Sequence, residues 1–192
     1  MRAVAREVGM VSSAVYRYFP TRDALLTAMI IESFGNLAEA LRQVRAAHDG
    51  QQWRALGLAL RHWARVNPYE FQLIYGTPIP GYVAPPETVP AAAAVAQPFL
   101  EAGARQAVQA YAHTAVTAQM TQLTGLAPGA DPSGVAAVLA ELAGLVGMLT
   151  LELSGHFVGS ADPADYLYEA LLDRQVATLG LRQRDDSDSI YP

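Results

Sequence analysis

The segment SGVAAVLAELAGLVGMLTLEL, from Ser133 to Leu153, is apolar on nearly every side of the helix that its residues favour. It is almost long enough to span a membrane, but Glu141 and Glu152 argue against a span. A helix that is apolar all round in a water-soluble protein is buried on two sides. The segment therefore predicts a fold in which this helix packs within its own domain and also against a second surface.

A second apolar segment, from Asp165 to Leu179, predicts a helix that pairs with the first. When two helices pack with one side against their own domain and with the other side against the same helix pair of a second copy, the four helices form a bundle. This is a common arrangement for a symmetric dimer. Small residues at Ala140, Gly144 and Gly147 allow another helix to approach closely. We therefore predict a homodimer. Its predicted interface residues are Val138, Leu142, Leu145, Leu149, Leu167 and Leu171.

Helical spacing also dominates the rest of the chain. From Arg22, apolar residues recur at three- and four-residue steps, which predicts a helix of about 25 residues, roughly 38 Å long, that ends at His48-Asp49-Gly50. Further helices are predicted over residues 52–66, 69–75 and 91–123, with Pro98 as a kink or restart, and Pro- and Gly-rich loops over residues 76–86 and 125–132. The first loop has the length of a functional or mobile loop. The sequence thus predicts an all-α protein.

The first 22 residues differ in charge from the rest of the chain. They hold four arginines and one glutamate, a net charge of +3, whereas the whole 192-residue chain has a net charge of −5 at pH 7. Two short helices are predicted, from Arg2 to Val8 and from about Ser12 to Tyr18, with a turn at Gly9. This arrangement predicts a helix-turn-helix, and cations beside hydroxyl groups suit phosphate contacts. On charge alone, a solvated surface is the more common interpretation of a basic run.

The segment VGMVSSAVYRYFPTRDALLTAMI, over residues 8–30, resembles the DNA-recognition segment of TetR-family transcriptional regulators. In that family a glycine turn leads into a recognition helix that ends in an aromatic run. This run is followed by a proline, a small polar residue, a basic residue, an acidic residue and a leucine. Here these are Gly9, the run VYRYF over residues 15–19, and PTRDAL over residues 20–25.

The resemblance implies a ligand-responsive DNA-binding regulator, most often a repressor. Such a protein binds a near-palindromic double-stranded operator as a homodimer and responds to a small-molecule effector. The implied domains are a helix-turn-helix DNA-binding domain over residues 1–35, a ligand-binding and dimerisation domain over residues 36–181, and a polar tail over residues 182–192. Arg17 can offer bidentate donors to guanine. The residues at which the resemblance implies DNA contacts are Arg2, Ser12, Ser13, Tyr16, Arg17 and Arg22.

The chain departs from the family pattern near its start. TetR-family domains place a further helix before the segment that begins here at Arg2, so we expect a helix-turn-helix domain that lacks its first helix. Val11 stands where the family usually has a Ser or Thr cap, a role that Ser12 can take. Residues 50–160 also resemble a TetR subgroup with a Trp-His-Gly-type C-terminal domain, although this chain keeps only the glycine, at Gly147.

A pocket between helices is the expected ligand site, since such pockets are mostly apolar with a few polar groups. Aromatic, methionine, histidine and acidic side chains of the middle segments are the candidates. The predicted effector is a small apolar or aromatic molecule of low charge. The predicted ligand-binding residues are His62, Trp63, Tyr69, Tyr75, Phe99, His113, Met120, Met148 and Glu152.

The sequence contains no pattern typical of an enzyme. Its four histidines are scattered, and it has neither a Gly-rich phosphate loop nor a nucleophile elbow. Glu152 and His156, four residues apart, can form half a metal site, but an ion pair at a helix end is the more common arrangement. We therefore predict no enzymatic activity, no metal, no cofactor and no membrane partner, and the absence of cysteine fits a cytoplasmic protein. Two alternatives stay open: a helical ligand-binding dimer that has lost DNA binding and a small helical enzyme.

Overall fold

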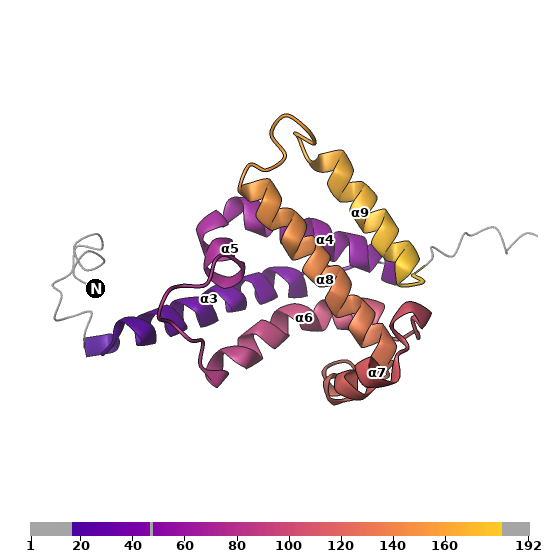
Figure 1. The fold of residues 1–192 in the computed structure, drawn as a ribbon, viewed down its shortest axis with the longest axis horizontal. Helices are drawn as coiled ribbons and strands as arrows, with labels where there is room; N and C mark the ends of the chain where they lie inside the picture. The colour runs from indigo at the N-terminus through magenta and orange to yellow at the C-terminus, as the bar shows by residue number, and fades with distance from the viewer. Residues whose placement is uncertain (1–16, 47, 182–192) are drawn as a thin grey trace, which may run out of the picture.

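The computed structural model describes residues 17–46 and 48–181 of the chain. In these residues the structure is all helical, which confirms the predicted fold class (Figure 1). The α-helices are α3 (Arg22–Arg42), α4 (Asp49–Val66), α5 (Pro68–Tyr75), α6 (Val89–Gly103), α7 (Thr114–Met120), α8 (Pro132–Leu153) and α9 (Asp165–Thr178). Three short 3-10 helices lie between them: η1 (Pro86–Thr88), η2 (Gln109–Tyr111) and η3 (Thr121–Leu126).

Helix α3 starts as predicted but ends earlier than predicted. Thr21 caps its N-terminus by accepting a hydrogen bond of 3.0 Å from a backbone N–H of the first turn. The helix ends at Arg42, and the predicted stop at His48-Asp49-Gly50 is instead the start of α4. A Cβ on Gly50 would lie 2.4 Å from the carbonyl oxygen of Leu181. This glycine therefore permits close packing within the fold and does not terminate a helix.

The core is centred on α4, which packs against α3, α6, α8 and α9. Trp53 is fully buried, and its ring meets the ring of Phe99 on α6 edge-on, with centroids 5.2 Å apart. The indole N–H of Trp53 donates to Oε1 of Gln175 at 3.0 Å. The Gln175 amide in turn donates to the carbonyl of Glu141 at 2.8 Å. A chain of buried hydrogen bonds thus joins α4, α9 and α8.

The prediction of one helix over residues 91–123 is wrong in the length of the helix. Helix α6 continues through Pro98 but ends at Gly103, and the chain then forms η2, α7 and η3. The start of α8 packs against this break. A Cβ on Gly134 would lie 2.5 Å from the carbonyl oxygen of Ala104, so only a glycine allows the two segments to approach so closely. Packing against α8 therefore overrides the helical pattern after Gly103.

Helix α8 confirms the helix predicted for its segment. Oδ1 of Asp131 accepts a hydrogen bond of 2.8 Å from the backbone N–H of Ser133, and Pro132 occupies the first turn. By length and composition, α3 and α8 could each span a membrane, but 39% and 50% of their apolar windows are buried within the domain. Both helices pack against α6, as core helices do.

Candidate functional site

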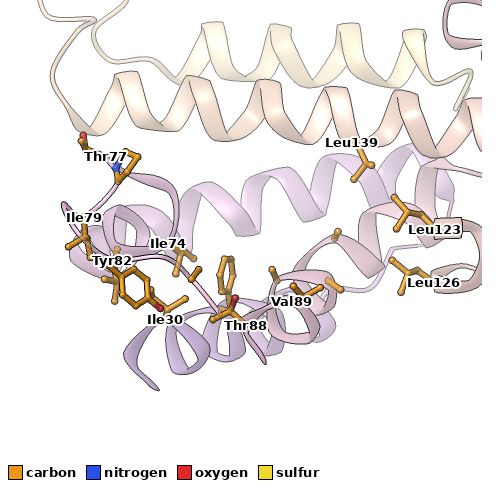
Figure 2. A pocket seen from close by; sticks show the side chains of 18 of the residues that line it. Ile30, Ile74, Thr77, Ile79, Tyr82, Thr88, Val89, Leu123, Leu126 and Leu139 are labelled. Carbon is orange, nitrogen blue, oxygen red and sulfur yellow. The ribbon is translucent and has the colours of Figure 1, made fainter. Parts of the chain in front are cut away.

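A cavity of about 630 Å³ lies between α3, α6, η3 and the connection from α5 to α6 (Figure 2). We call it the first cavity, and its volume lies in the usual range of small-molecule pockets. Aliphatic side chains from six parts of the chain form most of its wall. They include Ile30, Ile74, Ile79, Leu123, Leu126 and Leu139.

Uncharged groups alone line the first cavity. Its polar side chains are those of Thr77, Tyr82 and Thr88, and no Arg, His, Asp or Glu is among its lining residues. The hydroxyl of Thr88 donates to the carbonyl of Pro85 at 2.8 Å, so it is already engaged. An ion placed here would lose its hydration without gaining a counter-charge. The cavity therefore suits an uncharged ligand.

The strap, which we define as Gly76–Thr88 between α5 and α6, forms one wall of the first cavity. It supplies seven of the lining residues. It contains the loop predicted over residues 76–86, which is confirmed as irregular up to η1, with Gly81 at a φ of 77°. The hydroxyl of Tyr82 lies 2.9 Å from the hydroxyl of Thr27, a buried residue of α3. The strap is therefore tied to α3, which also lines the first cavity through Ile30 and Phe34.

A second cavity of about 530 Å³ lies where α5 meets the C-terminal end of α8. It shares Gly76 and Thr77 with the first cavity but has a more polar lining. Its neutral polar side chains are those of Gln72, Tyr75, Thr77, Thr150 and Ser154. Burial raises the pKa of Tyr75 to about 12, so its hydroxyl stays protonated at neutral pH and can donate a hydrogen bond.

The nine predicted ligand-binding residues do not meet in one cavity. None lines the first cavity, and Tyr75 alone of the nine lines the second. Trp63 and Phe99 are buried in the core, Met120 and Met148 are half-buried against it, and His62, Tyr69 and His113 are exposed. The prediction favoured aromatic and polar residues, whereas the first cavity is lined mainly by aliphatic side chains. In the sequence, these side chains have the same helical spacing as ordinary core residues.

Glu152, the ninth predicted residue, belongs to an ion cluster that also contains Arg61 and Asp165. Arg61 is 7% exposed and donates to both carboxylate oxygens of Glu152, at 2.6 and 2.9 Å, and to Asp165 at 2.9 Å. Its guanidinium also lies 5.0 Å from the ring centre of Tyr168. The hydrogen bond with Glu152 raises the pKa of Arg61, and the bond to Arg61 lowers the pKa of Asp165. This cluster joins α4, α8 and α9.

The predicted pairing of Glu152 with His156 is wrong. Helix α8 ends at Leu153, so His156 lies beyond the last turn and the i, i+4 geometry of a helix does not apply. The ion partner of Glu152 is Arg61 on α4. Within residues 17–46 and 48–181, no group of three or more His, Asp or Glu side chains is arranged to hold a metal ion.

The predicted DNA contacts lie mostly outside the described residues. Arg2, Ser12, Ser13 and Tyr16 fall there, whereas Arg17 and Arg22 are described and exposed. Arg22 is the first residue of α3. This helix begins at one edge of the described part of the chain (Figure 1). The same helix reaches the first cavity through Ile30 and Phe34. A single helix thus connects the N-terminal end with the cavity.

The predicted dimer contacts are mostly inside the protomer. Val138, Leu142, Leu145 and Leu149 are at most 8% exposed, because they face the core formed with α4 and α6, whereas Leu171 is half-buried and Leu167 is exposed. The prediction therefore named the inward face of α8. The outward face is also apolar, and its exposed residues are Ala140, Ala143, Gly144, Gly147 and Leu151.

The outward face of α8 has open space above its glycines. A Cβ on Gly147 would meet no described atom within 4 Å, and one on Gly144 would meet only Nε2 of Gln175, at 3.6 Å. Tyr166 and Leu167 add exposed apolar surface on α9. The spacing of small residues predicts a close approach by another helix, and no described helix of the protomer makes it at Gly147.

The chain matches two sequence families. Residues 53–175 match the family described as "Tetracyclin repressor-like, C-terminal domain", and residues 1–29 match "Bacterial regulatory proteins, tetR family". The HTH-type transcriptional regulators Rv1816 and MT1864 of Mycobacterium tuberculosis and Mb1846 of Mycobacterium bovis are each 44% identical over 91 residues. This match spans 45% of the chain and 39% of the length of each of these relatives.

Two solved structures share the fold over most of the chain. The crystal structure of SCO4313, described as a regulatory protein, superposes with a TM-score of 0.75 at 33% identity, over 92% of this chain and 84% of that one. A protein of unknown function from Rhodococcus sp. RHA1 superposes with a TM-score of 0.61 at 26% identity, over 95% of this chain and 84% of that one.

Proposed function

The chain belongs to the TetR family of transcriptional regulators, and from this premise we propose that it is a homodimeric repressor released from its operator by a small uncharged effector. The observation that carries the proposal is that α3 begins at Arg22, beside the DNA-reading segment, and also forms a wall of the first cavity. A ligand that fills the cavity can therefore change the position of α3 directly. Such a protein acts in the cytoplasm, where its DNA target lies.

The DNA-reading end is proposed to be residues 1–22. Arg17 would contact base edges and Arg22 a phosphate, together with the four candidates outside the described residues. Two copies of this end on one dimer would meet successive major grooves about 34 Å apart. A ligand that changes their separation and weakens operator binding tenfold would supply about 1.4 kcal/mol of coupling.

The homodimer is proposed to form through the outward faces of α8 and α9. Small residues at Gly144 and Gly147 support it, because they let a second helix approach closely. The apolar character of this face also supports it, since α8 is apolar on the side that points away from its own core. Two such helix pairs would form a four-helix bundle.

The test is selection of DNA by the full chain from a pool of random duplexes, followed by fluorescence anisotropy on the selected sequence. We expect sequence-preferring binding that weakens steeply with salt. Arg17→Ala should reduce the preference for the selected sequence over a scrambled one. Arg22→Ala should weaken binding to both and lessen the salt slope by about one.

Arg65→Ala is the matched control, because Arg65 is exposed on α4, within the C-terminal half of that helix. This substitution should change neither the preference for the selected sequence nor the salt slope. If the full chain selects no sequence and binds all duplexes equally, the repressor proposal fails and the alternative of a ligand-binding dimer without DNA recognition stands. Equal effects of Arg17→Ala and Arg22→Ala on the preference would contradict the separate roles given to them.

A further inference from the structure

We propose that the two cavities form one bipartite site for a neutral amphipathic molecule, with an aliphatic chain in the first cavity and a hydrogen-bonding polar end in the second. The inference rests on the proposed function, in which a small molecule is the effector, and it names the chemical class of that molecule. It follows from the lining residues that the two cavities share, from the differences between the linings and from the absence of charge in both.

The two cavities border the same two residues at the start of the strap. Gly76 and Thr77 line both of them, so a ligand that follows this segment enters both volumes. Figure 2 shows Thr77 at one end of the first cavity, with Leu123, Leu126 and Leu139 at the other end. An elongated molecule therefore fits this geometry better than a compact one.

The first cavity suits the aliphatic part of the ligand. Isoleucine and leucine side chains dominate the wall between Thr77 and Leu126, and the polar groups of Tyr82 and Thr88 already have protein partners. Each methylene group transferred from water into such surroundings contributes about 0.8 kcal/mol. Affinity should therefore rise with chain length until the far end at Leu126 is reached.

The second cavity suits a polar end that both donates and accepts hydrogen bonds. Gln72 offers an amide group that can do both. The protonated hydroxyl of Tyr75 can donate. The hydroxyl of Thr150 donates to the carbonyl of Val146 at 2.8 Å, so its oxygen is left as an acceptor. An alcohol or a carboxamide matches this set.

A ligand with a charged end does not match the lining of the second cavity. No Arg, His, Asp or Glu lines either cavity, so neither a carboxylate nor an ammonium group would find a counter-charge. The net charge of the chain, −5 at pH 7, further disfavours an anion. Neutrality of the ligand is therefore the most specific part of the inference.

The test uses the full chain and the neutral dye Nile red as a reporter of the first cavity. Displacement of the dye is measured with 1-decanol, decanamide, decanoate and decylammonium, which share one chain length, and with the shorter 1-hexanol. We expect 1-decanol and decanamide to displace the dye at concentrations about tenfold lower than the two ions, a difference of about 1.4 kcal/mol. The shorter alcohol should be weaker than 1-decanol.

Two variants test which cavity holds the aliphatic chain of the ligand and which holds its polar end. Leu139→Trp, which fills the first cavity, should remove most of the Nile red signal before any competitor is added, because the dye and the decyl chain occupy the same volume. Gln72→Leu should weaken decanamide while leaving the dye itself bound, and its matched control is Gln97→Leu, an exposed glutamine of α6 outside both linings. Circular dichroism and thermal melting of each variant establish that it is folded.

Equal displacement by decanoate and 1-decanol would overturn the inference, as would Gln72→Leu and Gln97→Leu acting alike on decanamide. Loss of the dye signal on raising the protein concentration alone would show that a second copy of the chain fills the cavity, and would also overturn it. Because the assay contains no DNA, these failures are separate from a failure of the repressor proposal. A chain that selects an operator but does not distinguish the decyl compounds would refute the ligand class alone.

Discussion

The hydroxyl groups of Tyr82 and Thr27 lie 2.9 Å apart and tie the strap to α3 across the edge of the first cavity. Thr27 is 6% exposed and lies one helical turn before Ile30, which lines the cavity. The strap and α3 therefore touch the same ligand volume and also each other. Because α3 begins at Arg22, any displacement of the strap that this hydrogen bond transmits acts on the helix that follows the proposed DNA-reading end.

Tyr82→Phe tests this tether. The substitution keeps the ring in the cavity wall but removes the hydroxyl, so the strap can move without drawing α3 with it. We expect the variant to bind selected DNA as the unchanged protein does, but to lose most of the reduction in DNA affinity caused by 1-decanol. The free energy of unfolding should fall by about 1 kcal/mol, the usual value for one hydrogen bond. Fluorescence anisotropy and urea unfolding measure the two effects.

Tyr69→Phe is the control for this substitution, because Tyr69 is 85% exposed on α5 and loses the same atom. It should change neither the response to 1-decanol nor the stability. If Tyr82→Phe keeps the full response, the hydrogen bond is a structural contact only, and coupling must pass through the direct contacts of Ile30 and Phe34 with the ligand.

Glu152→Gln tests the buried ion cluster. The glutamine has nearly the same shape but no charge, so Arg61 keeps a hydrogen-bond partner and loses its main counter-charge. Only the half-exposed Asp165 then remains as a counter-charge for the buried Arg61, and we expect the free energy of unfolding to fall by about 3 kcal/mol, the low end of the range for breaking a buried pair. Glu169→Gln, which breaks a solvent-exposed pair with Arg54, should cost less than about 1 kcal/mol. Similar losses in the two variants would show that the cluster is not effectively buried.

The cap of α8 should make stability depend on acid pH. The hydroxyl of Ser133 donates to Oδ1 of Asp131 at 2.6 Å, and this bond, with those from the backbone N–H groups of Ser133 and Gly134, lowers the pKa of Asp131 below 3.8. A group whose pKa is lower in the folded state stabilises the fold fully above its unfolded pKa, and this contribution is lost as the pH falls through the folded value.

Asp131→Ala should therefore lower the free energy of unfolding by about 1 kcal/mol at pH 7. The ionic part of this loss should shrink as the pH falls below about 4, since the unchanged protein then begins to lose its carboxylate. Urea unfolding of both proteins between pH 7 and pH 2 measures the difference. Glu32→Ala serves as the control, because it removes an exposed carboxylate of α3 that forms no ion pair with another described residue. A difference that stays constant down to pH 2 would contradict the role of the charge.

The sequence predicted the helices whose ends carry local signals. Thr21 and Asp131 are side-chain caps, and α3 and α8 start beside them as predicted. The helix ends that depend on tertiary packing were predicted wrongly. The sequence pattern predicts a helix stop at Gly50, but this residue lies in the first turn of α4 because Leu181 packs against it. The helix that ends at Gly103 does not continue because the start of α8 occupies the adjacent space.

The candidate site was the part least predictable from sequence. Ile30 and Leu139 line the first cavity, yet their apolar character and spacing are the same as those of buried residues such as Leu37 and Leu145. Which apolar residue faces a cavity depends on where the facing helix ends and where the strap crosses. Those features arise from contacts between distant segments, and no local pattern encodes them.

Gly147→Leu tests the proposed dimer face without disturbing the protomer. A Cβ on Gly147 would meet no described atom within 4 Å, so the fold should tolerate leucine, while a second helix packed closely on this position should not. We expect the unchanged protein to sediment as a dimer and the variant to sediment mainly as a monomer with the same circular dichroism spectrum. Gly35→Leu is the control, because Gly35 also lies within a helix, on the exposed side of α3, with open space around its Cβ position. A Gly147→Leu protein that remains as dimeric as Gly35→Leu would place the interface elsewhere on the surface.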